Sequence, residues 1–317
     1  MFSRIHSNQR NGFLMKSGAR RVFALSLTVL TANAGAVSSV ALPSWVCAKP
    51  DAIFIHGFES AIAVPHNPSQ GSGGSYPGSL SRSITVTGYA SEAYFLHVPP
   101  SYRPARAMPL LVVLHGAAGT HTDAITAASD LRDDWASVAD TNGFIVIAPV
   151  GENSNGAWNA PPGTPTDYDL IAAAFTDAAT AYNIERSRRY LWGFSAGGYV
   201  SYDVVLNGLN SNINAGVLAA YSANSADMGF ACVLYSGDCD QLLNAQARKV
   251  PVDIHVGIQD IQNPSHLAAA QADHTRLLAH GWTDASTVFY TEFNDGHTYF
   301  GQLPGAWHSL CGFALTP

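Results

Sequence analysis

The chain has 317 residues, of which 47% are hydrophobic and only 12% are charged. This balance indicates a globular protein with a sizeable core and excludes a disordered chain. The formal net charge is −7, and both nucleic acids and anionic membranes attract basic surfaces. We therefore expect neither nucleic acid nor a stable membrane association among its partners.

The N-terminal region has the pattern of a secretory signal. Two arginines precede the apolar run 22–30, and small residues follow with cleavage patterns that end at Ala34 or Ala36. A start at Met15 would make the charged region more usual in length. The alternative is an uncleaved anchor, because residues 22–42 lack charge over about the length that spans a bilayer. We expect a secreted protein, extracellular or periplasmic, and a monomer.

Four cysteines, Cys47, Cys232, Cys239 and Cys311, suit an exported chain, because an oxidising compartment favours disulfides. Four cysteines allow three connectivities. Cys232 and Cys239 are close in sequence and are predicted to pair, which leaves Cys47 for Cys311. The alternative is that some of them stay as buried thiols.

Three regions are predicted along the chain: a signal peptide at 1–36, an N-terminal segment rich in Pro, Gly and Ser at 37–83, and a single catalytic domain at 84–317. Residues 61–83 contain "NPSQGSGGSYPGS". Because such a composition offers little to bury, this stretch is predicted to be a surface linker or tail.

From Ile84 onward, strand-like apolar runs alternate with helix-like segments. In chain order the pattern predicts strands in 83–88, 92–100 and 109–116, a helix over 123–140, a strand at 144–149, a helix over 167–182, a strand at 189–194, a helix over 196–206, strands in 215–223 and 250–257, a helix over 265–280 and a strand at 286–293. Continuous Val, Ile and Leu runs between helices indicate parallel crossovers. We predict an α/β fold, a mostly parallel doubly wound sheet with helices on both faces, and a ligand site beyond the carboxyl ends of its strands.

Ser195 follows one predicted strand directly, in the stretch Gly193-Phe-Ser-Ala-Gly197. A serine nucleophile on a sharp strand-to-helix turn needs small neighbours, because the two elements fold back on each other there. The alternative is an ordinary glycine-rich turn in which the serine caps the helix.

A serine nucleophile needs a base, and the base needs a carboxylate that orients it. Asp260 comes just after the strand 250–257 and is the predicted acid, although it can also serve as a simple turn residue. Its competitor Asp253 lies inside that strand.

His297 is the predicted base, because it follows the last strand in a loop that opens with Asn-Asp-Gly. His308 is the competitor, in a stretch that is predicted to be a C-terminal helix. His266, His274 and His280 fall on the preceding helix and are expected to be surface or packing residues.

The turn His115-Gly-Ala-Ala-Gly119 follows the first core strand. A glycine-rich turn at this position can direct a backbone amide at developing negative charge, together with the amide of Ala196. The two amides would form an oxyanion hole. The ring of His115 is expected to hold this loop by hydrogen bonding.

These motifs resemble the polyhydroxybutyrate depolymerase and feruloyl esterase group of secreted α/β-hydrolases. The resemblance runs from about Ser83 to the C-terminus and includes "PLLVVLHG", "GAWNAPP", "RSRRYLWGFSAGG" and "DGHTYFG". It implies Ser195 as nucleophile, Asp260 as acid and His297 as base.

The resemblance also implies Ala117 and Ala196 as the amide donors and suggests that Trp158 lines the substrate cleft, the alternative being a core tryptophan. The chain departs from the group at two places beside the expected pocket. It has Ala117 where many members carry a cysteine, and Tyr299-Phe300 where many carry Trp-Pro. Tyr299 is accordingly expected at the substrate.

The expected activity is that of a secreted serine esterase that acts on small or polymeric esters through an acyl-enzyme. Two alternatives remain: an amide-cleaving hydrolase with the same triad, and a secreted polymer-binding protein that has lost catalysis. No metal or other cofactor is expected, since the twelve histidines do not cluster at ligand spacing. Asp167 and Asp169 are expected to cap a helix.

Overall fold

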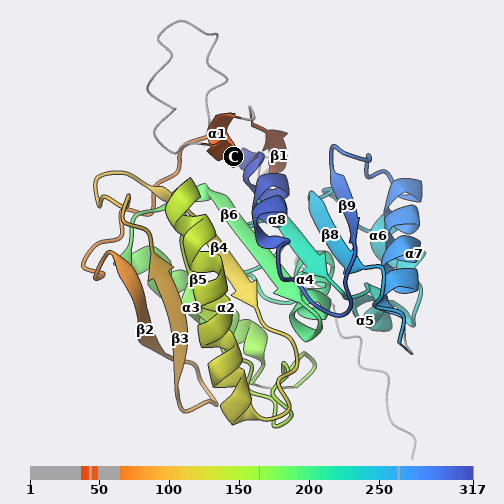
Figure 1. Cartoon of the computed structure of the whole chain (residues 1–317), viewed down its shortest axis with the longest axis horizontal. Helices are drawn as coiled ribbons and strands as arrows, with labels where there is room; N and C mark the ends of the chain where they lie inside the picture. The colour runs from red at the N-terminus through yellow and green to blue at the C-terminus, as the bar shows by residue number, and fades with distance from the viewer. Residues whose placement is uncertain (1–36, 43–44, 49–64, 164, 263–264, 317) are drawn as a thin grey trace, which may run out of the picture. The chain divides into compact units, whose positions relative to one another are not determined.

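An eight-stranded sheet forms the centre of the computed structural model (Figure 1). Its strands in chain order are β2 (Gly78–Thr85), β3 (Ser91–Val98), β4 (Met108–Leu114), β5 (Ile145–Pro149), β6 (Ile184–Phe194), β7 (Ala220–Asn224), β8 (Val252–Gly257) and β9 (Val288–Phe293). They lie in the order β2-β3-β5-β4-β6-β7-β8-β9. The six neighbouring strands β5, β4, β6, β7, β8 and β9 run parallel to one another, whereas β2 pairs antiparallel with β3, and β3 pairs antiparallel with β5. The predicted mostly parallel α/β sheet is confirmed.

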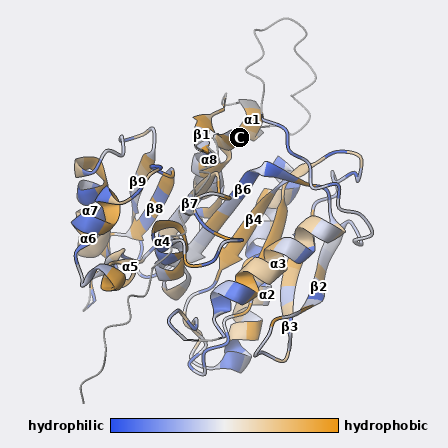
Figure 2. Cartoon of the chain, turned by 180° about the vertical axis from the view of Figure 1, so that it is seen from behind, coloured by the Kyte–Doolittle hydropathy of each residue, from blue (hydrophilic) through white to orange (hydrophobic). Residues whose placement is uncertain are grey.

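Helices cover both faces of this sheet. They are α2 (His121–Asn142) and α8 (Leu303–Cys311) on one face, and α3 (Asp167–Ala181), α4 (Ala196–Asn207) and α7 (His266–Ala279) on the other. Strand β4 shows why, since it is hydrophobic along its length (Figure 2) and buried on both sides. Leu111 and Val113 pack in the core with α2 and α8, and Leu110 and Val112 pack in the core with α3 and α4. A strand covered on both faces therefore needs the continuous apolar run seen in the sequence.

The structure describes residues 37–42, 45–48, 65–163, 165–262 and 265–316. The predicted signal peptide, 1–36, lies outside them. Among the helices of the described part, none combines the length and the apolar composition needed to cross a lipid bilayer.

Short elements that the sequence pattern did not predict tie the two ends of the described chain together. Strand β1 (Ser38–Ala41) pairs antiparallel with β10 (Phe313–Thr316), and α1 (Trp45–Ala48) is joined to α8 by the disulfide Cys47–Cys311. A second disulfide, Cys232–Cys239, joins the short helices α5 (Gly229–Cys232) and α6 (Cys239–Asn244), which flank a 3₁₀ turn, η2 (Val233–Tyr235). Both predicted cysteine pairs are present.

The described part of the predicted linker, residues 65–83, packs on the domain instead of standing free. The backbone N–H of Ser69 donates to Ile184 O at 2.8 Å, and that of Gly74 donates to Ala181 O at 3.0 Å. A Cβ at Gly71 would lie 2.3 Å from Tyr182 O, so only glycine allows this approach. Side chains attach the segment as well, since Tyr76 packs on Tyr102 at 5.0 Å between ring centroids and Leu80 packs on the core. Residues 78–83 belong to strand β2, so the described part of the segment is part of the folded domain and not a linker.

One buried carboxyl makes the stability of the fold depend on pH. Asp273 on α7 is 3% exposed, and its Oδ2 accepts the N–H of Met228 at 2.7 Å. Burial raises the pKa of Asp273 to about 7. A carboxyl whose folded-state pKa is raised binds more protons in the native than in the unfolded state. Its stabilising contribution is therefore complete at low pH and is lost as the pH rises through about 7.

We expect Asp273→Asn to be more stable than the parent protein at pH 8. Asparagine keeps an oxygen for Met228 but carries no charge, so the loss of stability between pH 5 and pH 8 should shrink by at least about 1.4 kcal/mol. Urea unfolding of both proteins at the two pH values measures this difference. Asp295→Asn, at an exposed carboxylate that forms no ion pair among the described residues, is the control. An identical pH dependence in Asp273→Asn and the parent protein would contradict the assignment.

Candidate active site

The turn at Ser195 brings β6 and α4 so close together that only glycine fits on either side. Strand β6 ends at Phe194 and α4 begins at Ala196, with Ser195 at φ 50° and ψ −118°. A Cβ at Gly193 would lie 2.1 Å from Gly197 O, and one at Gly197 would lie 2.3 Å from Leu114 O. The two glycines are therefore required by close backbone approach, and the strained serine carries its hydroxyl out of the turn.

We expect Gly197→Ala to destabilise the protein by about 1–3 kcal/mol, because the added methyl group meets the backbone of β4, which cannot move aside alone. Urea unfolding gives the difference. Gly312→Ala is the matched control, since a Cβ there meets nothing within 4 Å. Equal stability of Gly197→Ala and the parent would show that the turn tolerates a side chain.

Three residues from the ends of separate strands meet at this turn. Ser195 Oγ lies 2.9 Å from His297 Nε2, and His297 Nδ1 lies 2.8 Å from Asp260 Oδ2. Burial opposes ionisation of Asp260, but the hydrogen bond and charge of His297, together with His266, hold its pKa below the usual value. The ionised carboxylate only accepts, so Nδ1 of His297 carries the proton and Nε2 accepts from the serine hydroxyl.

Asp260 is held by its backbone and by its side chain. The N–H of Asp260 donates to Gly257 O at 3.0 Å, and its carbonyl accepts the N–H of Leu267 at 3.0 Å, in the first turn of α7. The second carboxylate oxygen, Oδ1, lies 3.1 Å from His266 Nδ1. The expectation that His266 is only a surface or packing residue is wrong. Nothing in its sequence neighbourhood signals this contact, because α7 begins after a loop of unpredictable path.

The two competing residues lie elsewhere. Asp253 is 1% exposed within β8, where it bonds to Ser222 Oγ at 2.7 Å and His255 Nε2 at 3.1 Å. His308 is an exposed residue of α8 near the Cys47–Cys311 disulfide. Neither forms a hydrogen bond with Ser195 in the described part of the chain.

The loop after β4 passes beside Ser195, and hydrogen bonds of the His115 ring hold it in place. Its Nδ1–H donates to Gly116 O at 2.7 Å and its Nε2 accepts the N–H of Gly151 at 2.9 Å. Burial lowers the pKa of His115 to about 4, so the ring is neutral at physiological pH and fixed in one tautomer. A Cβ at Gly116 would lie 3.2 Å from the Cβ of Ser195, so the backbone of Gly116 passes close to Ser195. The next residue, Ala117, therefore lies near the turn that carries Ser195.

The amides of Ala117 and Ala196 are not used by the described turn, loop and cap hydrogen bonds. Ala196 is the first residue of α4, and the first N–H groups of a helix have no partner within it. Both amides belong to segments that adjoin Ser195, which is the placement that the oxyanion-hole prediction requires.

Trp158 belongs to the core and not to the cleft. Its side chain is 7% exposed, and its Nε1–H donates to the carbonyl of His115 at 2.9 Å. The indole also packs on the His115 ring at 4.6 Å between centroids. The core alternative is therefore correct at this position, and the indole supports the loop that carries Ala117.

A cavity of about 470 Å³ opens beside the triad on the side of this loop. Tyr299 lines it, packs on Phe194 at 5.0 Å between ring centroids, and donates its hydroxyl to Asp134 at 2.7 Å. The cavity has an apolar wall and an acidic rim, and its lining residues include Ala117, Ala118, Leu131, Phe194, Phe300, Asp130 and Asp134. Phe194, the residue before Ser195, is part of this lining.

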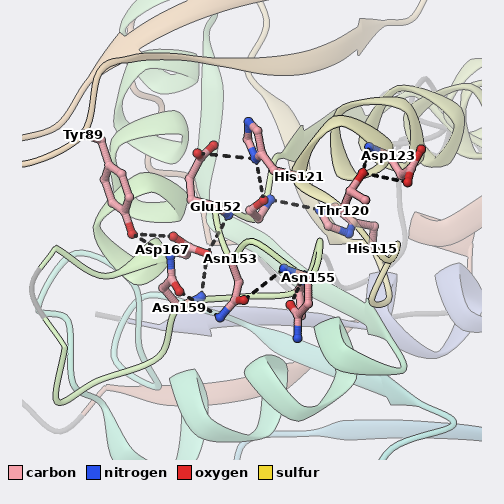
Figure 3. A network of polar contacts seen from close by, with 12 residues as sticks. Tyr89, His115, Thr120, His121, Asp123, Glu152, Asn153, Asn155, Asn159 and Asp167 are labelled. Carbon is pink, nitrogen blue, oxygen red and sulfur yellow. Dashed lines mark hydrogen bonds and ion pairs between the residues drawn. The ribbon is translucent and has the colours of Figure 1, made fainter.

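The described part of the loop after β5, residues 151–163, has a course that cannot be read from periodicity and is organised by Asp167 (Figure 3). Its Oδ2 accepts the N–H groups of Glu152 and Asn159 at 2.9 and 2.7 Å, and its Oδ1 accepts the Tyr89 hydroxyl at 2.6 Å. Asp169, two residues later, forms a capping box with Thr166. The capping expectation is confirmed for Asp169, whereas Asp167 fixes the loop behind the His115 turn.

No protein-family model matches the chain. Over 107 residues the chain is 32% identical to a bifunctional acetylxylan esterase/xylanase of Neocallimastix patriciarum, a match that covers 34% of this chain and 15% of the relative. Over 132 residues it is 27% identical to a probable dipeptidyl-aminopeptidase B of Neosartorya fischeri, covering 39% of this chain and 14% of the relative. The chain thus spans only a small part of the curated relatives that it matches.

Solved structures resemble a larger share of the chain. A ferulic acid esterase covers 74% of this chain and 96% of its own length, with a TM-score of 0.52 and 14% identity. The S-formylglutathione hydrolase of Staphylococcus aureus covers 74% and 98%, also with a TM-score of 0.52 and 14% identity. Dipeptidyl peptidase 4 of Porphyromonas gingivalis covers 72% and 33%, with a TM-score of 0.51 and 14% identity. At this identity the likeness concerns the fold alone, and the chain has the α/β-hydrolase fold.

Proposed function

We propose that the chain is a serine esterase that hydrolyses carboxylic esters through an acyl-enzyme. Ser195 Oγ attacks the ester carbonyl while His297 Nε2 takes its proton, and Asp260 stabilises the imidazolium that forms. The amides of Ala117 and Ala196 bind the oxyanion. His297 then returns the proton to the departing alkoxide, and a water molecule, activated by the same imidazole, releases the acid from Ser195.

The observation that carries this proposal is the unbroken hydrogen-bond chain from Ser195 through His297 to a buried carboxylate, at 2.9 and 2.8 Å. An ordinary glycine-rich turn has no reason to place a strained, outward-facing serine against an imidazole that is itself oriented by an ionised group. The same hydrogen bonds between Ser195, His297 and Asp260 argue against a binding protein that has lost catalysis.

A fluorophosphonate probe tests the proposal directly. The probe reacts with a serine only when a neighbouring base activates it, so we expect one label per chain, located on Ser195 by peptide mass spectrometry. A short-chain p-nitrophenyl ester should be hydrolysed by the unlabelled protein and not by the labelled one. A protein that stays unlabelled and inactive toward every ester would support the binding-protein alternative.

Amide cleavage is the second candidate, and the partial match to dipeptidyl-aminopeptidases is the observation that favours it. An ester and a p-nitroanilide with the same acyl group separate the two activities. We expect the ester to be preferred, because an alkoxide leaves the tetrahedral intermediate more readily than the nitrogen of an amide does. Asp130, Asp133 and Asp134 line the cavity and are the groups that would hold the amino terminus of a peptide, so equal rates on the two substrates would favour the peptidase.

The proposed substrates are acyl esters of polysaccharides, such as feruloyl or acetyl esters, or polyhydroxyalkanoates and other polyesters. The partial match to an acetylxylan esterase supports the first group, and the open, partly apolar cavity accepts either. We propose that the protein is exported, since both cysteine pairs form disulfides. A panel of p-nitrophenyl acetate, feruloylated oligosaccharide, acetylated xylan and polyhydroxybutyrate ranks the substrates by kcat/KM.

A further inference from the structure

The acid of the triad is shared between two imidazoles, and one of them has no part in the proposed reaction. The Nδ1–H of His297 donates to Asp260 Oδ2 at 2.8 Å, and the Nδ1–H of His266 donates to Asp260 Oδ1 at 3.1 Å. The two rings face each other at 4.6 Å between centroids with a tilt of 33°. The ligand-type atoms of Asp260, His266 and His297 all lie within 4.8 Å of one another.

Two imidazoles and a carboxylate whose ligand-type atoms lie within 4.8 Å of one another are a donor set for first-row transition metals. Imidazole suits Zn²⁺, Cu²⁺ and Ni²⁺, whereas Ca²⁺ and Mg²⁺ require sets of oxygen ligands. The two imidazoles can be reached from solvent, since the side chains of His266 and His297 are 18% and 39% exposed, whereas the carboxylate between them is buried. A tetrahedral site would need the three ligand atoms to move closer together, with water as the fourth ligand.

The three side chains are also held in place, because the backbone of α7 forms a hydrogen bond with the backbone of Asp260. Leu267 N–H donates to Asp260 O, and Ser265, the N-cap of α7, holds the first turn through Ala268 N–H. His266 is therefore fixed in register with Asp260. The other described group of ligand-type side chains, at Cys47, His308 and Cys311, is unsuitable because its two sulfurs form a disulfide.

We propose that Asp260, His266 and His297 form an inhibitory site for a divalent transition metal ion, with Zn²⁺ as the probe. The metal takes the lone pair of Nδ1 on each imidazole, so the single proton of each neutral ring moves to Nε2. His297 Nε2 then carries hydrogen and no longer accepts the Ser195 proton. Occupation of the site thus removes the base without touching the serine, and its effect on turnover rests on the proposed function.

Metal binding itself is measured without turnover. In Ser195→Ala, which keeps all three ligands, we expect one Zn²⁺ per chain by calorimetry and the visible absorption of a four-coordinate site with Co²⁺. His266→Asn in the same background is the matched variant. Asn keeps an N–H near the position of Nδ1 for Asp260 but offers no imidazole, so the affinity for Zn²⁺ should fall at least about tenfold. Equal affinities with and without His266, or no binding of Zn²⁺ to Ser195→Ala in the micromolar range, would overturn the site.

The second readout is inhibition of ester hydrolysis, with each variant compared with its own metal-free rate. Zn²⁺ should inhibit the parent protein and His274→Asn at the same concentration, EDTA should restore activity, and His266→Asn should need at least about tenfold more Zn²⁺. Inhibition of His266→Asn at the parental concentration would overturn the proposal. A chain that binds Zn²⁺ through His266 but hydrolyses no ester would leave the metal site standing and refute the proposed function instead.

Discussion

Ser195→Ala is expected to lower kcat for a p-nitrophenyl ester by about 10⁴-fold or more, with little change in the midpoint of thermal unfolding. The hydroxyl oxygen bonds only to His297 Nε2 among the described side chains. Its backbone keeps the turn, because Ser195 N–H still donates to Asn224 O at 2.9 Å. The methyl group of alanine occupies the place of the serine Cβ, so the turn strain is the same in both proteins. Loss of activity without loss of stability is the signature of a nucleophile.

The measurement combines initial rates with circular dichroism of the same preparation. Ser309→Ala is the matched control, since Ser309 lies on α8 and, among the described residues, its hydroxyl donates only to Gly305 O in its own helix. We expect the control to keep the parental kcat. Activity of Ser195→Ala within tenfold of the parent would refute the assignment of Ser195, and equal loss in both variants would point to a damaged preparation.

The fold could be predicted from the sequence where side chains alone decide the structure. Strand β4 is covered on both faces, so its residues form a continuous apolar run that is visible in the sequence. Ser195 could be located because close approach at Gly193 and Gly197 restricts residue choice. Asp260 and His297 then followed as candidates, because parallel strands bring their carboxyl ends to one edge.

The rest depends on contacts between distant segments, which leave no periodic pattern. Residues 65–77 attach through backbone hydrogen bonds to 180–184, and a backbone donor can belong to any residue type except proline. Strands β1 and β10 are 4 residues each, too short to show alternation. Trp158 is ambiguous because an indole suits a core and a cleft equally, and only its bond to the His115 carbonyl decides. The role of His266 could not be predicted either, because its contact with Asp260 depends on the path of the loop between the two residues.

Asp260→Asn is expected to lower kcat by about 10³ to 10⁴-fold while the KM changes little. An amide has one oxygen and one NH₂ group, whereas the two carboxylate oxygens of Asp260 face two imidazoles at 2.8 and 3.1 Å. With NH₂ toward His297, Nδ1 becomes an acceptor, the ring proton moves to Nε2, and Ser195 loses its base. With oxygen toward His297, the tautomer survives but the negative charge that stabilises the imidazolium is gone. Both orientations are therefore slow.

The control for this variant is Asp295→Asn. Asp295 lies two residues before His297 and is exposed, and within the described part of the chain its carboxylate accepts only the N–H of Gly296. It should keep the parental kcat, because it does not touch the imidazole. Fluorophosphonate labelling provides a second reading, since the labelling rate of Asp260→Asn should fall with kcat when the serine has lost its base. If Asp260→Asn kept the parental kcat, the assignment of Asp260 as the acid of the triad would be wrong. Asp253 would not replace it, because it lies within β8 and is committed to Ser222 and His255.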